Sequence, residues 1–314
     1  KVAVIAIGGN SLILSKDAQT VQDQYRALCV TGKHIVSLVE LGYQVVVTYG
    51  NGPQVGFLLW RSEVAHATSG LHGLPLVTCV ADTQGGIGYQ IQQTLKNEFL
   101  RRGLCEDSIA VLTQVVVDGN DPAFQHPTKP IGAFMSKEEA EKMAREKGWH
   151  IAEDAGRGWR QVVASPKPMA VVELTTIRAL AEADNVVIAC GGGGIPVIAT
   201  DHHHLKGAAA VIDKDLASEL LAEHLDADML IILTAVEKVA VNFNKPNQKW
   251  LDALTPEEAR TYIGEGQFAP GSMLPKVEAA VKFAESKPGR TALITLLEKA
   301  RDGIDGKTGT RITC

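Results

Sequence analysis

Glycine is concentrated in three short segments that could bind an anion. Gly8-Gly9-Asn10, Gly50-Asn51-Gly52 and the run Gly191–Gly194 each follow directly after a short apolar run that is typical of a β-strand. Glycine lets backbone N–H groups face an anion because no Cβ stands in the way. One such segment alone would favour a tight strand-to-helix turn. Three at equivalent strand ends favour several loops around one ligand.

Three lysines occupy positions where a negative ligand would stabilise them. Lys129 lies between two prolines, and Lys214 and Lys276 lie near the predicted starts of helices. A lysine is unfavourable at a helix start because the macrodipole is positive there. Phosphoryl transfer requires cations of this kind, backbone donors and an acid that holds the cations in place. Asp213 and Asp215 flank Lys214, and either could be no more than an N-cap.

The elements that must position these residues alternate along the chain. Continuous apolar runs rich in Val and Ile indicate strands buried on both faces, hence a parallel sheet. Apolar stripes at helical spacing separate them, the first from Val21 to Val39. This alternation predicts a doubly wound α/β sandwich. The predicted strands are Val2–Ile7, Gln44–Thr48, Ile109–Val117, Val186–Cys190, Met229–Thr234 and Ala292–Thr295.

One stretch departs from this alternation. From about Asp121 to Pro168 the chain is polar and rich in proline, with one charged helix candidate at Lys137–Lys147. We interpret it as an insertion that protrudes from the sheet, a candidate lid. A second, less marked candidate domain boundary falls near residues 200–207. Residues 308–314 are expected to form a short edge strand.

Composition and missing motifs exclude several classes of protein. The 314 residues carry 31 basic and 36 acidic side chains, and the net charge of −5 argues against a nucleic-acid partner. No apolar run reaches the ~18–20 residues of a membrane helix, and the N-terminal run lacks the pattern of a signal peptide. The five cysteines are widely spaced, so we expect no disulfides or zinc site and a cytoplasmic location. The adjacent histidines at 202–204 do not share a face, and we interpret them as a solvated loop rather than metal ligands.

Several of these segments together resemble the amino-acid-kinase superfamily and, within it, the carbamate kinases. The glycine segments at Gly8–Asn10, Gly50–Gly56 and Ala189–Pro196 are similar to the superfamily. Longer stretches resemble the carbamate kinases over nearly the whole chain, and PTKPIG, EDAGRGWR, IDKD and FAPGSMLPK are the most specific of them. These stretches span residues 79–89, 112–118, 127–132, 153–160, 210–217, 233–239 and 268–280.

The resemblance implies a fold and a reaction. The fold is a three-layer αβα sandwich on a largely parallel open sheet, with a protruding subdomain (about 121–168) inserted in the N-terminal half, and a homodimer is expected. Residues 1–206 would form a lobe for carbamate or carbamoyl phosphate, and residues 207–314 a lobe for ATP or ADP. The reaction is reversible, Mg²⁺-dependent phosphoryl transfer from carbamoyl phosphate to ADP. In the family it is usually the ATP-forming last step of arginine degradation.

The resemblance also implies roles for residues at matching positions. Lys129 and Lys214 would clamp the moving phosphoryl group, Asp215 would orient the lysines, and Lys276 would neutralise the nucleotide phosphates. Arg157 and Arg160 match the family pattern and belong either to the site or to the support of the insertion. The residues implied to contact the substrate are Gly8, Gly9, Asn10, Gly50, Asn51, Gly52, Gly191 and Gly192. Those implied to border the nucleotide are Lys214, Thr234, Ala235, Val236, Ala269, Pro270, Gly271, Met273 and Lys276.

Two other functions compete with this one. A kinase for an amino-acid carboxylate would need a carboxylate clamp and an ammonium pocket, which we do not find in the sequence. A non-catalytic nucleotide-binding protein on the same fold would not need the full set of Lys129, Lys214, Asp215 and Lys276. One position departs from the family pattern, because Ala240 stands where some members carry a cysteine.

Overall fold

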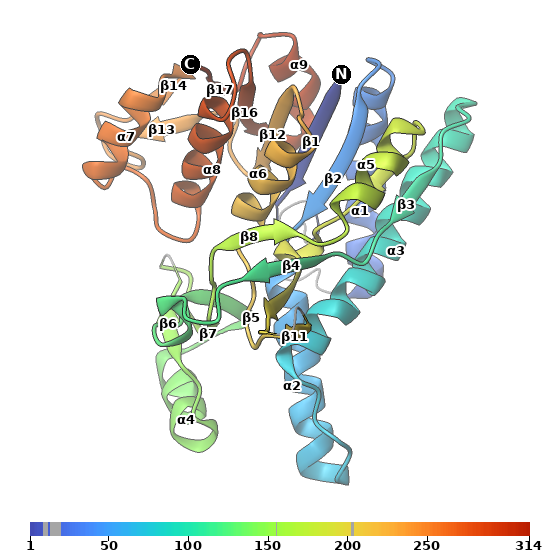
Figure 1. Cartoon of the computed structure of the whole chain (residues 1–314). Coiled ribbons are helices and arrows are strands. Elements are labelled where there is room, and N and C mark those ends of the chain that lie inside the picture. Colours follow the sequence, from blue (N-terminus) through green and yellow to red (C-terminus); the bar gives the residue numbers. More distant parts are fainter. Residues whose placement is uncertain (9–11, 13–19, 155, 202–203) are drawn as a thin grey trace.

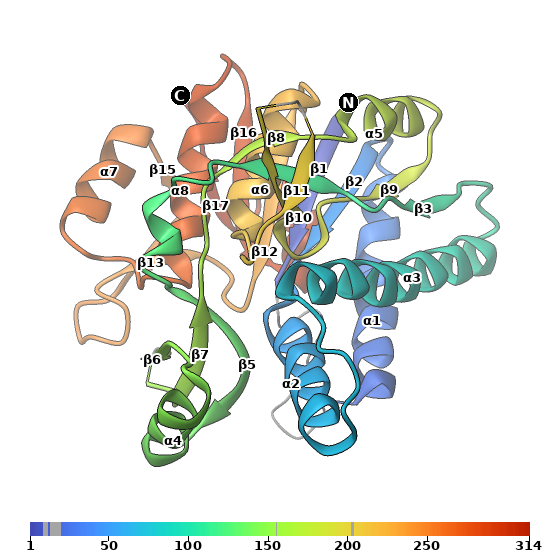
Figure 2. The ribbon, with the colours of Figure 1, turned by 60° about the horizontal axis from the view of Figure 1, so that its bottom comes forward.

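Three layers and a smaller projection make up the fold. The computed structural model describes residues 1–8, 12, 20–154, 156–201 and 204–314. A central sheet lies between two sets of helices, and a β-rich subdomain and helix α2 (Gly52–Ser69) project from one side, away from both chain ends (Figure 1 and Figure 2). The predicted αβα sandwich with a protruding subdomain is confirmed. Within the described residues, no helix is long and apolar enough to cross a membrane.

The central sheet is largely parallel. Its strand β1 pairs in parallel with β2 and with β12, so the sheet is continuous across the expected lobe boundary at residue 206. Strand β17 runs antiparallel to β16 and is not the edge strand that we predicted, because β15 pairs with its other side. From edge to edge the strands are β15 (Ala253–Leu254), β17 (Thr310–Ile312), β16 (Thr291–Leu296), β12 (Met229–Thr234), β1 (Val2–Ile7), β2 (Gln44–Tyr49), β9 (Val186–Ile188) and β3 (Ser108–Ala110).

Successive residues of each central strand are buried against opposite helical layers. In β1, Val4 and Ala6 pack against one layer, and Ala3, Ile5 and Ile7 pack against the other. Burial on both faces explains why these strands are continuous apolar runs. The first layer consists of α5 (Leu174–Glu182), α6 (Lys214–His224), α7 (Pro256–Gly264) and α8 (Met273–Glu285). The second consists of α1 (Val21–Val39), α3 (Leu76–Arg102) and α9 (Ala300–Ile304).

The apolar run at 109–117, predicted as one strand, is divided between two sheets. Strand β3 ends at Ala110, and β4 (Gln114–Val117) belongs to a second sheet. Between them the Gln84 side chain bonds both backbone groups of Thr113, accepting from its N–H at 2.8 Å and donating to its carbonyl at 3.1 Å. A buried amide on α3 thus takes the place of a strand partner at the Thr113 N–H, while the Thr113 carbonyl also accepts from the Ile195 N–H at 2.8 Å. The apolar pattern does not reveal this. The second sheet has the order β11 (Leu205–Gly207), β10 (Ile195–Ala199), β4 and β8 (Pro168–Val171). The remaining elements are the hairpin of β13 (Val239–Val241) and β14 (Lys249–Leu251) and the 3-10 turns η2 (Pro122–Phe124), η3 (Gly191–Gly193) and η4 (Leu297–Lys299).

The predicted insertion folds as an antiparallel sheet with one helix. It contains β5 (Lys129–Met135), α4 (Lys137–Lys147), β6 (Ile151–Glu153) and β7 (Trp159–Val163). Helix α4 has the bounds that the sequence predicts. A capping box of Ser136 and Glu139 begins it, and Gly148, with a φ of +68°, ends it.

A close backbone contact joins the subdomain to α2. A Cβ on Gly56 would lie 2.2 Å from the Cα of Gly132 in β5, so only glycine fits at Gly56. Val55 and Ile131 beside these glycines belong to one small buried cluster. The contact fixes β5, which begins with Lys129, against the helix that follows the second glycine loop.

Candidate active site

Three glycine loops meet at the carboxyl edge of the central sheet. Gly8 follows β1, Gly50–Gly52 follow β2, and η3 follows β9, and these strands are adjacent in the sheet. Gly8, Gly50–Gly52 and Gly192 line one pocket. Gly192 has a φ of +66°, and a Cβ there would lie 2.3 Å from Asn51 Nδ2, so the third loop packs closely on the second.

Three of the residues expected to contact the substrate are not among the described residues that line this pocket. Gly9 and Asn10 lie outside the described residues. Gly191 is not among the described residues that line the pocket. A Cβ on Gly191 would lie 2.3 Å from the Tyr49 hydroxyl oxygen, so packing alone accounts for this glycine.

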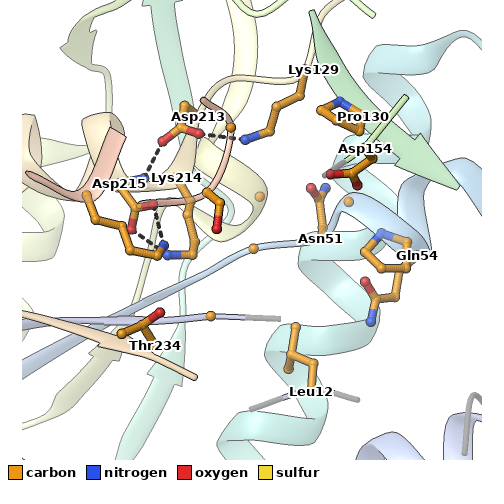
Figure 3. Close-up of a pocket in the computed structure, with 18 of the residues that line it drawn as sticks. Leu12, Asn51, Gln54, Lys129, Pro130, Asp154, Asp213, Lys214, Asp215 and Thr234 are labelled. Carbon is orange, nitrogen blue, oxygen red and sulfur yellow. Dashed lines mark hydrogen bonds and ion pairs between the residues drawn. The ribbon is translucent and has the colours of Figure 1, made fainter. Parts of the chain in front are cut away.

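The pocket has a volume of about 310 Å³ and an excess of positive charge. Its described lining carries five cationic and three anionic side chains, so the pocket favours a polyanion. The cations are Lys129, Lys214, Lys276, Arg157 and Arg160, and the anions are Asp154, Asp213 and Asp215. Figure 3 shows that Lys129 reaches the Asp213–Asp215 segment from the subdomain side.

Asp215 holds two of the three lysines. Its Oδ1 accepts a hydrogen bond from Lys214 Nζ at 2.5 Å, and its Oδ2 accepts one from Lys276 Nζ at 2.8 Å. Lys214 and Asp215 are the first residues of α6, and Lys276 lies in the first turn of α8. The carboxylate therefore offsets part of the macrodipole penalty that the sequence led us to assign to a ligand.

Asp213 holds the third lysine. Its Oδ1 caps α6 by accepting from the Asp215 N–H at 2.8 Å, and its Oδ2 accepts from Lys129 Nζ at 2.6 Å. The N-cap was foreseen as an alternative, whereas the ion pair was not, because its partners are 84 residues apart. Among the described groups, the two carboxylates leave one lysine charge unmatched.

Burial and charge shift the pKa values of this cluster. Burial lowers the pKa of Lys214 to about 8, since the Lys276 cation opposes the effect of Asp215. Burial acts on Lys276 too, but there Asp215 outweighs it and raises the pKa. Burial alone would raise the pKa of Asp215, and the two lysines instead hold it well below its usual range. Asp215 is therefore ionised at neutral pH, and Lys214 titrates near the physiological range.

Arg157 and Arg160 support the subdomain as well as lining the pocket. Each guanidinium donates to Asp154 at 2.9 Å, and Arg160 also donates to the carbonyl of Gly132, at 2.9 Å from Nη2. Both lie 5.0 Å from the centre of the Phe134 ring. The two arginines thus tie β5 to the segment between β6 and β7.

A second cavity of about 390 Å³ adjoins the first and shares Thr234, Ala235 and Ser272 with it. Its wall includes Phe243 and Trp250, whose rings meet edge to face at 6.3 Å. The predicted nucleotide-bordering residues that line it are Thr234, Ala235, Val236, Ala269 and Met273. Gly271 lines the first pocket instead, and Pro270 is not among the described residues lining either cavity.

Metal-ligating clusters are not found in the described ranges. No group of three or more His, Cys, Asp or Glu side chains there could hold a metal ion. Two of the three adjacent histidines, His202 and His203, lie outside the described residues. The expectation of a solvated loop at these histidines therefore stays a prediction.

Glycine loops at the carboxyl edge of an αβα sheet, buried lysines and an adjoining second cavity define a kinase for a small molecule. The family model described as "Amino acid kinase family" matches residues 1–295, so the chain belongs to the amino acid kinase family.

Relatives within this family carry the name of one kinase. "Carbamate kinase-like protein YqeA" of Escherichia coli (strain K12) is 54% identical over 99% of both chains. The carbamate kinase of Clostridium perfringens is 49% identical over 98% of both chains. The solved structure of carbamate kinase from Giardia lamblia bound to AMP-PNP has a TM-score of 0.89 and 40% identity, covering 100% of this chain and 98% of its own. The chain is therefore a phosphotransferase, and its similarity supports the activity of the carbamate kinases.

Proposed function

We propose that this protein transfers a phosphoryl group between carbamoyl phosphate and ADP, forming ATP and carbamate. The observation that carries the proposal is the pair of carboxylates that gathers Lys129, Lys214 and Lys276 in the first pocket, which the second cavity adjoins. The similarity to carbamate kinases over 98% of both chains supports the same reaction.

The proposed transfer is direct and in line. Carbamate attacks or leaves through its own oxygen, so the protein contributes position and charge rather than a nucleophile. Lys129 and Lys214 clamp the moving group, and Lys276 neutralises the nucleotide phosphates. Cys190 beside the third loop does not act as a nucleophile, because burial raises the pKa of its thiol well above neutral pH.

Phosphate recognition dominates the binding of the small substrate. Carbamate has four heavy atoms, and at a ceiling of ~1.5 kcal/mol per atom it can contribute at most ~6 kcal/mol of binding free energy. The rest of the affinity for carbamoyl phosphate comes from its phosphate, to which the excess of cations in the pocket is suited.

Mg²⁺ belongs to the proposal as a companion of the nucleotide. Asp213 and Asp215 are both paired with lysines, so neither is a free carboxylate ligand. Mg²⁺ commonly retains waters and binds substrate phosphates with few protein ligands, and this coordination fits the site. When bound, the ion would neutralise phosphate charge next to Lys276.

The cellular setting is also proposed. ATP formation at the end of arginine degradation, a cytoplasmic location and a homodimer follow from the family resemblance. All five cysteines are free thiols, which supports a reducing compartment.

Exposed apolar side chains on α2 and α3, Trp60 and Leu100 among them, support burial by a second copy, which light scattering would test. The two ligand-binding lobes, residues 1–206 and 207–314, are proposed as two regions of the chain that share one continuous sheet.

Substrate competition in the reverse direction tests the proposal against an amino-acid kinase. ATP and Mg²⁺ are offered with bicarbonate plus ammonia, which supply carbamate, or with glutamate or aspartate. We expect ADP release with bicarbonate and ammonia and only background with the amino acids. ADP release with an amino acid alone would assign the other substrate class, and ATP binding without turnover would indicate a binding protein.

A further inference from the structure

Gln54 places an unpaired acceptor in the wall of the candidate active site. It lies in the first turn of α2, two residues after Gly52, and its side chain lines the pocket. Its Oε1 is buried and has no hydrogen-bond partner among the described residues. A buried polar atom without a partner is costly, so an acceptor left open beside a substrate pocket points to a donor on the ligand.

Two other glutamines fix which end of the Gln54 amide is open. Gln90 Nε2 donates to the carbonyl of Val21 at 3.3 Å, and a carbonyl can only accept. Gln90 Oε1 therefore accepts from Gln24 Nε2, at 2.5 Å, and Gln24 Oε1 accepts from Gln54 Nε2, at 2.8 Å. Because this chain through α1, α2 and α3 uses the amino group of Gln54, the open end is an oxygen.

The position of Gln54 matches the carbamoyl end of the substrate. In the view of Figure 3, Gln54 and Asn51 lie across the pocket from Asp213 and Asp215, and Thr234, where the second cavity begins, lies on the side of the carboxylates. In-line transfer places the acceptor and the nucleotide on opposite sides of the phosphoryl group. With the nucleotide in the second cavity, the group that reaches Gln54 belongs to the small substrate.

We propose that Gln54 Oε1 accepts a hydrogen bond from the amino group of carbamate or carbamoyl phosphate, and that this bond selects a carbamoyl group over an acyl group. The inference rests on the proposed function and adds to it the residue that reads the substrate nitrogen. An acetyl methyl cannot donate, so it leaves the acceptor unpaired, and sites of this kind discriminate strongly against analogues that lack the donor. Gln24 and Gln90 are positioning residues that act through Gln54.

The test compares two stable ligands that differ only in this group. Phosphonoacetamide and acetonylphosphonate are isosteres of carbamoyl phosphate and acetyl phosphate, with an amide NH₂ in the first and a methyl in the second. Their dissociation constants are measured by calorimetry in the presence of ADP. We expect the unaltered protein to bind the amide roughly tenfold or more tightly than the ketone, and Gln54→Met to bring the two constants within about twofold. Gln93→Met on α3 is the matched control and should keep the preference, because Gln93 is not among the described residues lining the pocket.

A second variant keeps the proposal testable if Gln54→Met folds poorly. Gln54→Glu retains an acceptor oxygen, so it should still favour the amide although its charge weakens both ligands. An unchanged preference in folded Gln54→Met, or equal binding of both ligands by the unaltered protein, overturns the inference. ATP formation from carbamoyl phosphate by the unaltered protein is measured in parallel. If no ATP forms, the proposed function itself is contradicted. If ATP forms but Gln54→Met keeps the preference for the amide ligand, only the role of Gln54 is contradicted.

Discussion

One buried carboxylate, Asp215, organises the charges of the site at the residue scale. It holds Lys214 and Lys276 at the starts of two different helices, where neither lysine would otherwise be stable. The lysines are therefore positioned before any ligand arrives, and preorganised charge is the main source of catalysis in phosphoryl transfer.

Removing either lysine should abolish most of the turnover. Lys214→Ala and Lys276→Ala should each lower kcat by ~10²–10³, the usual effect of losing one preorganised donor. The change in stability should be small by comparison, because Asp215 keeps one lysine partner. The control is Lys299→Ala, because this lysine on η4 has a side chain that is 45% exposed and is not among the described residues lining the pocket. Near-normal turnover in either variant would refute the role given to that lysine.

Removing the carboxylate should cost stability as well as activity. Asp215→Asn leaves the buried Lys214 and Lys276 amines close together without the carboxylate to which both are hydrogen-bonded, which should reduce the free energy of unfolding by about 3–5 kcal/mol. Urea denaturation measures this change. Asp252→Asn is the matched control, since Asp252 pairs with Lys238 at a side chain that is 82% exposed. Equal stability of the two variants would contradict the account.

Activity should fall at alkaline pH. Lys214, with a pKa of about 8, is charged below that pH and neutral above it. Because the cation is the form that stabilises phosphate, kcat/KM should be level below about pH 8 and decline above it. The profile is measured with correction for spontaneous breakdown of carbamoyl phosphate. A level profile to pH 10 would show that Lys214 does not need its proton.

The crossing of α2 and β5 sets the position of Lys129 at the scale of elements. Gly56→Ala should force α2 and β5 apart, because the new Cβ would lie 2.2 Å from Gly132. We expect a loss of about 1–3 kcal/mol in stability, together with reduced turnover as Lys129 shifts from Asp213. In α3, Gly85→Ala meets no described atom within 4 Å and should be neutral or stabilising. Comparable melting and turnover in the two variants would contradict this view of the contact.

Local signals made most elements predictable, and long-range contacts limited the rest. Strands β1 and β12 and helices α1 and α4 have the predicted bounds, because apolar periodicity and capping residues lie within each segment. The break at Thr113 could not be predicted, since it depends on Gln84 from α3. Likewise, β15 covers β17 through a pairing that no local pattern encodes.

At the scale of the whole molecule, the proposed function divides substrate binding between two adjoining cavities. Ala240 of β13 lines the second cavity only, in the part of the chain that the structure describes. Ala240→Phe should fill that cavity and raise the KM for ADP roughly tenfold, with little change in the KM for carbamoyl phosphate. Ala170→Phe, at an exposed position of β8 outside both described linings, is the control. A rise in the KM for carbamoyl phosphate alone would reverse the assignment of the cavities.

The site could be predicted only where its residues follow local signals in the sequence. Glycine loops after strands and lysines at helix starts are visible in the sequence, and Gly8, Gly50, Lys129, Lys214 and Lys276 line one pocket. Their roles toward the substrates stay predictions. The pairing of Asp213 with Lys129 and the glutamine chain that ends at Gln54 join segments far apart in sequence. Such contacts arise only when the sheet, α2 and the subdomain come together.

The most direct test of the central claim is ATP formation from ADP, Mg²⁺ and carbamoyl phosphate, followed with luciferase. The account predicts rapid ATP formation that strongly favours carbamoyl phosphate over acetyl phosphate and falls at least ~10²-fold in Lys214→Ala. Background levels of ATP from folded protein that binds ADP would contradict it.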